Sequence, residues 1–256
     1  MLMRTTLIAS AALAFVAMVA EAHSWADCVD WRFNDPTKPG WSEKDGKCFG
    51  YARQFPAKER KPFGDLDSDS PNRHYQQGKN MVPCSPGKDT GDGGESGADE
   101  TRKIPLSKSY EEGNKDFGPM AKVKAGDQMC VRWPSKNHAF ESKIEQVHIN
   151  MPLTPLDKDP NQAGFDDANL VKLKYNNCSF TDDKDHTPCG GCFKIPETLA
   201  TGDYVLQWRW LLVNSGTDEY YTSCWDVNVQ AAGPIDPLLP IPLGANTNVF
   251  GSLIFS

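Results

Sequence analysis

The stretch Gly202-Asp203-Tyr204-Val205-Leu206-Gln207-Trp208-Arg209-Trp210-Leu211-Leu212 carries the clearest structural pattern in the chain. Successive side chains of a β-strand point to opposite faces. One face would then present four large side chains, Tyr204, Leu206, Trp208 and Trp210. The other face would present Val205, Gln207 and Arg209. The alternation predicts a strand with one face buried more deeply than the other.

Further strands are predicted by short runs rich in β-branched and aromatic residues between turn-forming clusters. These runs are 128–133, 143–151 and 220–229. No stretch from residue 23 onward shows a sustained helical period with capping residues. Short antiparallel strands joined by long loops predict an all-β fold of the sandwich type.

The composition is that of an ordinary globular chain with a mildly acidic balance. The 256 residues contain 27 Lys and Arg against 34 Asp and Glu, a net charge of −7, without any dense basic tract. Binding to nucleic acid requires a clustered basic face, so we do not expect nucleic acid as a partner. The polar stretch 58–116 is expected to be a loop, and the Pro-rich residues 231–256 to be an extension outside a domain that spans 23–230.

The first residues have the features of a secretory signal. Arg4 precedes an apolar run at 7–20, and Ala20-Glu21-Ala22 has the small residues of a cleavage site. The run is shorter than the roughly 20 residues that span a bilayer as a helix, which argues against a membrane anchor. We therefore expect residues 1–22 to be removed, leaving a secreted, extracellular protein that begins at His23 and has no membrane partner.

All eight cysteines lie beyond the predicted signal, and an even number in a secreted chain indicates a set of disulfides. Spacing does not determine how eight thiols pair. Cys189-Gly190-Gly191-Cys192 has the spacing of a redox pair, but no βαβ pattern lies nearby, so structural bridging is favoured. The sequon Asn177-Cys178-Ser179 fits export, although a bridged Cys178 would hinder glycosylation.

A metal site is indicated by the residue at the predicted new N-terminus. Cleavage would give His23 a free α-amino group, so its amine and imidazole nitrogens could chelate one ion. The alternative is a frayed terminus that carries a histidine by chance. His138 is the favoured second ligand, because it follows the strand at 128–133 by a short polar turn. Lower in rank are His148, inside the next strand, and two histidines in polar loops, His74 and His186.

The donor types favour copper. Two imidazoles and an amine suit copper in both of its oxidation states better than they suit Mg or Ca. Zinc is the competing metal, but no H-E-x-x-H run is present. In the predicted strand at 220–229 and just before it, alternation puts Glu219 and Tyr221 on one face. Tyr221 could present its phenol to the metal and Glu219 a supporting acceptor, whereas the alternative for Tyr221 is core packing.

Taken together, these motifs resemble those of the lytic polysaccharide monooxygenases. The resemblance lies in an exported N-terminal His23, the strand end Val131-Arg132-Trp133-Pro134-Ser135-Lys136-Asn137-His138, the strand start Gly202-Asp203-Tyr204, and Tyr221-Thr222-Ser223-Cys224. The segments 23–31 and 48–53 look most like the oomycete secreted family that attacks pectin. The resemblance extends loosely over 24–229, but the stretch 58–116 has no counterpart in it.

The resemblance implies an immunoglobulin- or fibronectin-like antiparallel β-sandwich that holds one copper ion. The ligands it implies are the amine and Nδ1 of His23, Nε2 of His138 and an axial Tyr221, with Glu219 near the oxygen site. It also implies cycling between Cu(II) and Cu(I), an external electron donor, and O2 or H2O2 as co-substrate. The activity would be oxidative cleavage of a plant cell-wall polysaccharide, with pectin (homogalacturonan) favoured, by a monomer.

The expected substrate sets a physical requirement, because pectin is a polyanion and the chain is acidic. Local positive charge near the metal would have to come from residues such as Arg53, Arg132 and Lys136. Cellulose or chitin would instead be served by flat, exposed aromatic side chains. The candidates for that role are Trp25, Trp31 and Trp41, whose alternative place is the core.

Two other classes of function stay open at this level. A copper-binding or delivery protein could use the same two histidines without oxygenase activity. A disulfide-rich adhesion or effector domain would need no metal at all. The sequence has no G-x-S-x-G elbow, no P-loop and no G-x-G-x-x-G after a strand. Paired carboxylates for glycoside hydrolysis stay open, because such pairs come from distant strands.

Overall fold

The computed structural model describes residues 24–53, 75–77, 83–84, 121–135, 138–139, 144–156, 159–180, 187–213 and 218–232, with the backbone alone at 75–77 and 218–219. Strands dominate these residues, and the predicted all-β class is confirmed. Within them, no helix is long and apolar enough to cross a membrane. The predicted signal at 1–22, nearly all of the extension at 231–256 and most of the stretch 58–116 lie outside the described residues.

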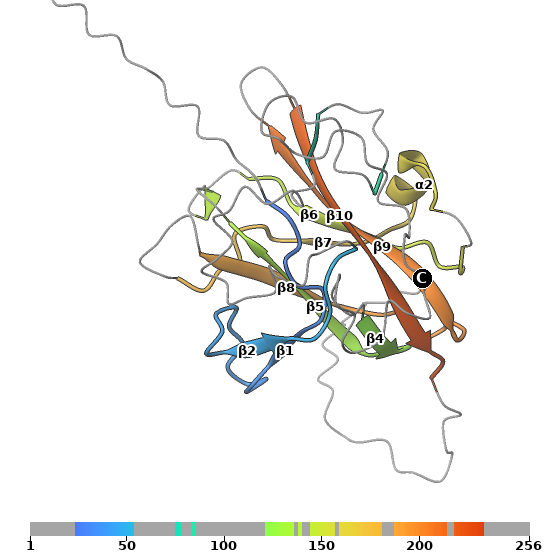
Figure 1. The fold of residues 1–256 in the computed structure, drawn as a ribbon, viewed down its shortest axis with the longest axis horizontal. Helices are drawn as coiled ribbons and strands as arrows, with labels where there is room; N and C mark the ends of the chain where they lie inside the picture. The colour runs from blue at the N-terminus through green and yellow to red at the C-terminus, as the bar shows by residue number, and fades with distance from the viewer. Residues whose placement is uncertain are drawn as a thin grey trace, which may run out of the picture.

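The larger sheet contains six strands. Its order is β3 (Tyr75–Gln77), β10 (Asp218–Gln230), β9 (Gly202–Val213), β6 (Val147–Asn150) and β7 (Asn169–Leu173), all antiparallel to their neighbours. The sixth strand, β4 (Ala121–Lys124), pairs in parallel with the last four residues of β10. β9 and β10 form a long hairpin that runs diagonally across the molecule (Figure 1).

A second layer packs against this sheet. It contains β5 (Gln128–Pro134) paired with β8 (Pro188–Lys194), and beside them the short hairpin of β1 (Trp31–Phe33) and β2 (Gly46–Cys48) (Figure 1). Side chains of β5 and β8 share one buried core with those of β6, β9 and β10. The rings of Trp133 and Trp208 join the layers, with centroids 6.0 Å apart. Two layers around one core form the predicted antiparallel β-sandwich.

β9 is buried on its predicted core face and, at Val205 and Gln207, on the opposite face as well, which its alternation did not predict. The four large side chains of the predicted core face are indeed buried in the main core. On the opposite face Val205 packs with Phe165 and with the Cys84–Cys224 disulfide. Phe165 belongs to α2 (Gln162–Asp166), a helix of five residues. A helix of five residues leaves no periodic pattern in a sequence. The burial of this face of β9 by α2 was therefore not predicted.

Four of the strands were predicted and the others were not. The predicted strand at 143–151 is shorter in the structure, since β6 begins at Val147. The strands that were missed are short or broken by polar residues and glycine: β1, β2, β3, β4, β7 and β8. Two of them, β3 and β4, are held by pairing with the much longer β10, which is a tertiary effect rather than a local preference.

All eight cysteines form disulfides, as their even number indicated. The pairs are Cys28–Cys48, Cys84–Cys224, Cys130–Cys192 and Cys178–Cys189. The two cysteines of the 189–192 motif therefore bond to other partners, which confirms structural bridging over a redox pair. Between them, a Cβ at Gly190 would lie 2.3 Å from the ring of Trp41, so β8 requires glycine at this close approach.

Candidate metal centre

His138 lies just beyond the end of β5. Its backbone N–H donates to the carbonyl of Ser135 at 3.1 Å, and the N–H of Ser135 donates to the carbonyl of Thr187 at 3.0 Å. The imidazole is buried, with its centroid 5.5 Å from the ring of Trp210 on β9. The turn after β5 thus places the imidazole against the central hairpin.

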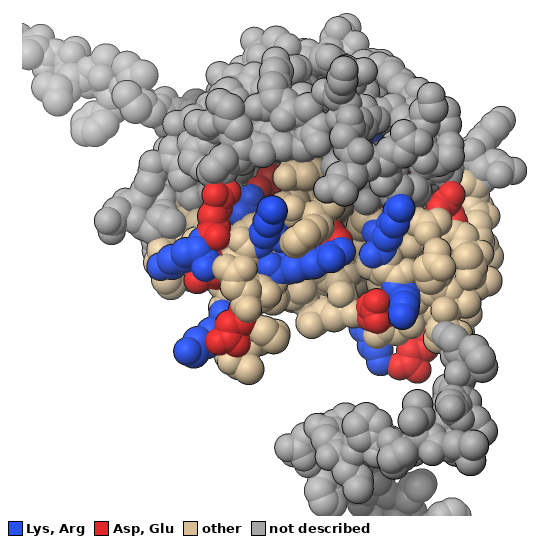
Figure 2. Space-filling model, turned by 60° about the horizontal axis from the view of Figure 1, so that its bottom comes forward, with Lys and Arg blue, Asp and Glu red and all other residues tan. Residues whose placement is uncertain are grey.

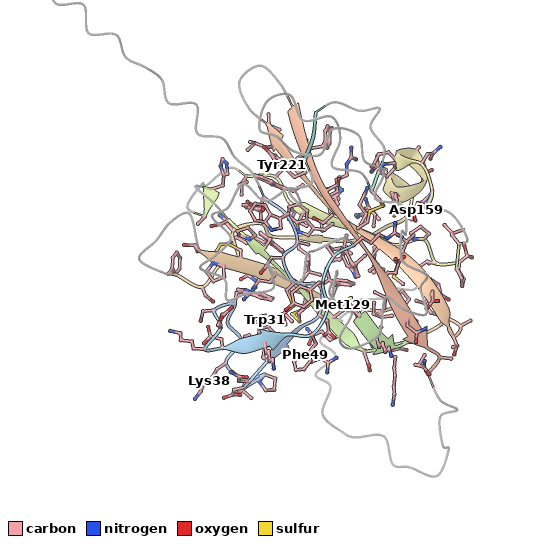
Figure 3. The ribbon with its side chains drawn as sticks, in the orientation of Figure 1. Trp31, Lys38, Phe49, Met129, Asp159 and Tyr221 are labelled. Atoms are coloured by element: carbon pink, nitrogen blue, oxygen red, sulfur yellow. A yellow bond between two sulfur atoms is a disulfide. The ribbon has the colours of Figure 1, made fainter. Side chains whose placement is uncertain are left out.

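Tyr221 reaches the same indole from the neighbouring strand. It pairs in register with Trp210 across the β9–β10 hairpin, and the two ring centroids are 5.3 Å apart. Figure 3 shows Tyr221 in the upper part of the hairpin, well away from the β1–β2 hairpin. His138 and Tyr221, 83 positions apart in the sequence (221 − 138), therefore meet at one ring.

Trp210 is itself held firmly. Its indole N–H donates to the carbonyl of Glu145 at 3.1 Å, and the ring of Tyr175 stacks on it at 4.0 Å. The Tyr175 hydroxyl donates to the carbonyl of Ser135 at 3.1 Å, inside the turn that leads to His138. One aromatic stack therefore supports both the turn and the strand. Alternation had placed Trp210 in the core, but no sequence signal linked Tyr175 to this site.

The first described residues, which begin at Ser24, bond to β5, which leads to His138, and to β10, which carries Tyr221. Ser24 Oγ donates to the carbonyl of Pro134, the last residue of β5, at 2.7 Å. The N–H of Ala26 donates to Oγ of Ser223, two residues after Tyr221, at 3.0 Å. The segment that directly follows His23 is thus held between the elements that carry His138 and Tyr221. His23 itself lies outside the described residues.

His148 is kept apart from this cluster. In β6 it pairs in register with Arg209, so it lies on the sheet face opposite to Trp210. Burial, followed by the charges of Lys172 and Arg209, lowers the pKa of His148. This position agrees with its low rank as a ligand.

The remaining candidates are His74, His186 and the side chain of Glu219, which lie outside the described residues. Among the side chains that the structure does describe, no group of three or more His, Cys, Asp or Glu could hold a metal. A centre at His138 would therefore need donors of another kind, such as a chain-terminal amine and a phenol.

Two arginines expected to supply surface charge are buried instead. Arg132 forms an ion pair with Asp27 in which both side chains are almost completely buried. Burial raises the pKa of Asp27, and Arg132 opposes this rise. Arg53 is likewise buried between Asp226 and Asp159. The expectation that either arginine offers charge to a substrate is therefore wrong; Lys136 lies outside the described residues.

The tryptophans proposed as an exposed aromatic platform are also in the interior. Trp25, Trp31 and Trp41 are all buried. Trp31 lies under the guanidinium of Arg132, with 4.3 Å between Cζ and the ring centroid, and its indole N–H donates to the carbonyl of Gly40. The expectation of an exposed aromatic platform is therefore wrong, because these three tryptophans pack in the core. Sequence context could not separate these two outcomes, because a tryptophan suits both.

No family model and no curated protein matches the chain. Among solved structures, it is similar to a chitin binding domain from Burkholderia pseudomallei, with 13% identity, 80% of this chain and 84% of that chain covered, and a TM-score of 0.35. It is also similar to a cellulose-active polysaccharide monooxygenase from M. thermophila, with 14% identity, 46% of this chain and 56% of that chain covered, and a TM-score of 0.29.

A glycoside hydrolase family 61 member from Hypocrea jecorina shows 12% identity, with 51% of this chain and 62% of that chain covered and a TM-score of 0.30. The chain thus spans less than two thirds of this protein and of the monooxygenase from M. thermophila.

Proposed function

We propose that this chain is a secreted, copper-dependent lytic polysaccharide monooxygenase that cleaves plant cell-wall polysaccharide oxidatively, with pectin (homogalacturonan) as its substrate. The strongest support is that three segments far apart in the sequence lie close together in the structure. The turn of His138 and the strand of Tyr221 share the ring of Trp210, and the segment after His23 is bonded to both elements. Four disulfides fit an oxidising extracellular compartment.

The donors at this centre fit copper. The amine and imidazole of His23 and the imidazole of His138 are nitrogen ligands of the kind that copper prefers, and Tyr221 would add its phenol oxygen. When bound, copper supplies the one-electron chemistry by which O2 or H2O2, with an external reductant, removes hydrogen from a sugar carbon beside the glycosidic bond. The buried position of His138 and Tyr221 limits the access of water to these donors.

The chain's own contribution is to hold the donors in place. Trp210 restricts the imidazole of His138 and the phenol of Tyr221, because it packs against both rings and is fixed by its own contacts. Ser24 orients the backbone that leads to His23. To Glu219, whose side chain lies outside the described residues, we assign the role that the resemblance implies, which is to hold a proton near the reacting oxygen.

Copper titration followed by electron paramagnetic resonance tests the centre on protein that starts at His23. One tight Cu(II) site per chain with nitrogen hyperfine structure is expected. One extra residue before His23 should abolish it, because the terminal amine is then blocked. His138→Ala should abolish it as well, whereas the matched control His148→Ala, on the other sheet face, should keep it. Tight binding in His138→Ala would contradict the ligand assignment.

A product assay then tests the reaction. The copper-loaded protein is incubated with a reductant and pectin, cellulose or chitin, and oxidised oligosaccharides are sought by mass spectrometry. Pectin is expected to give them. Copper binding without products from any of the three would indicate a copper-binding or delivery protein, and products from cellulose or chitin alone would replace the substrate assignment.

A further inference from the structure

One aromatic side chain next to the β1–β2 hairpin is partly exposed to solvent. Phe49 directly follows β2, and 43% of its surface is exposed. Its backbone N–H donates to the carbonyl of Asp30 at 2.9 Å, so the hairpin fixes where the ring stands. Figure 3 shows Phe49 in the lower part of the molecule and Tyr221 in the upper part. The exposed ring is therefore separate from the candidate metal centre.

Two cations lie against this ring. Cζ of Arg32 is 4.3 Å and Nζ of Lys47 is 5.7 Å from its centroid. Both lie within the roughly 6 Å at which the face of an aromatic ring attracts a cation. The side chain of Arg32 is 55% exposed, and Lys47 is exposed as well. These three residues form an open aromatic and cationic surface, called the Phe49 patch below.

The carboxylates of the hairpin are engaged by their own chain. Asp30 accepts hydrogen bonds from Nε and Nη2 of Arg32 at 3.1 and 2.7 Å, which leaves Nη1 of the guanidinium outside this pair. Asp35 and Asp45 each accept hydrogen bonds from residues in the connection between β1 and β2. Asp30 thus offsets the charge of Arg32, whereas the donors to Asp35 and Asp45 are neutral and leave those two carboxylates charged. The ammonium of Lys47 lies over the exposed ring.

Two further basic residues belong to β4, the strand that Gly50 contacts. Gly50 follows Phe49 and packs on β4, since a Cβ at Gly50 would be 3.3 Å from the Cβ of Ala121. The next residue of β4, Lys122, is exposed, as is Lys124. Figure 2, which turns the lower side of Figure 1 forward, shows Lys and Arg side chains spread across this face. Asp and Glu side chains stand among these cations in Figure 2, so the face carries both signs of charge.

We propose that the Phe49 patch binds uronate units of a carboxylated polysaccharide, as a second contact surface apart from the metal centre. The proposal rests on the proposed function, since it takes pectin as the polymer. The C–H groups of a sugar ring would contact the exposed part of Phe49 that Arg32 and Lys47 leave uncovered, while its carboxylate would meet Lys47 and the outer edge of Arg32. Charge complementarity favours a polyuronate over a neutral glucan here.

Affinity electrophoresis of the processed protein, in gels that contain polygalacturonate or the neutral hydroxyethylcellulose, tests the proposal. Phe49→Ala and Lys47→Glu should each weaken binding to polygalacturonate about tenfold, or about 1.4 kcal/mol. Phe49→Tyr keeps an aromatic face and should retain binding. Lys38→Glu makes the same charge change in the same hairpin but away from the ring (Figure 3), and should weaken binding by less than about twofold.

The outcomes separate the patch from the metal centre. Copper spectra of all four variants should match those of the unmodified protein, because the patch lies apart from the copper ligands. Equal retardation by polygalacturonate of the unmodified protein, Phe49→Ala and Lys47→Glu, each compared with its own migration in a gel without polymer, would overturn the proposal. Equal retardation by polygalacturonate and by the neutral glucan would also overturn it. If polygalacturonate binding depends on the Phe49 patch but pectin yields no oxidised products, the proposed monooxygenase function is wrong. The proposal of uronate binding at the Phe49 patch is then still supported.

Discussion

Replacing Asp226 by Asn tests whether a buried ion cluster holds β10 in place. The side chains of Arg53 and Asp226 are 1% and 0% exposed, and Arg53 donates to Asp226 at 2.9 and 2.7 Å. Burial alone would lower the pKa of Arg53, but Asp226 and Asp159 together raise it, so the guanidinium stays charged. Asparagine keeps the shape of Asp226 but removes the charge that faces this cation.

Removing one partner of a buried ion pair costs about 3–5 kcal/mol, because the other charge is left without compensation. Asp159 still pairs with Arg53 after the substitution, and its side chain is 17% exposed, so we expect the lower end of that range, about 3 kcal/mol. In a chain of this size, each kcal/mol lowers the melting temperature by roughly 2–4 °C. Asp226→Asn should therefore melt about 6–12 °C lower.

Denaturation in guanidinium chloride with the disulfides intact measures the free energy of unfolding, and calorimetry measures the melting temperature. The matched control is Glu197→Gln, which breaks the exposed ion pair with Lys194 and should change the free energy of unfolding little. A loss in Asp226→Asn no larger than that of the control would refute the view that the Arg53 cluster stabilises β10.

Three further predictions concern the centre and its surroundings. Ser24→Ala removes one hydrogen bond next to His23 and should weaken Cu(II) binding about fivefold without abolishing it. Copper titration measures this affinity. An unchanged affinity would mean that the Ser24 hydrogen bond does not orient the N-terminus. Tyr221→Phe should keep copper bound but change the electron paramagnetic resonance spectrum of the Cu(II) site. An identical spectrum would mean that the phenol of Tyr221 is not a copper ligand. The pKa of His148 is lower in the folded protein, so its contribution to stability is present above the unfolded pKa of about 6.5 and is lost as pH falls through the folded value. Urea unfolding from pH 8 to pH 5 should show this loss, and His148→Gln should reduce it; an equal loss in the variant would assign it to other groups.

The two long strands β9 and β10 and the bonded state of the cysteines could be predicted from the sequence, because both depend on local information. Alternation over eleven positions predicts β9, and the run after it predicts β10. The even count of cysteines and the missing βαβ pattern predicted disulfides for the 189–192 motif, but the partners depend on which strands come together.

The surroundings of the candidate centre could not be predicted, because they depend on contacts between distant positions. Asp27 neutralises Arg132 across 105 positions, and Asp226 neutralises Arg53 across 173. Each arginine looks like a free cation when only its neighbours in sequence are considered. The stack of Tyr175 on Trp210 likewise joins two strand regions with no shared motif.

One edge of β10 is covered along its length by three separate segments. β3 pairs near its start, the N–H of Arg53 donates to the carbonyl of Cys224 in the middle, and β4 pairs near its end. All three precede β10 in the chain, so each must wait until that strand has been synthesised. Such long-range pairing is slow and leaves apolar surface open in the meantime. The aromatic strands of this protein should therefore depend on chaperones during synthesis, and once folded β10 offers no open edge to another chain along the paired residues.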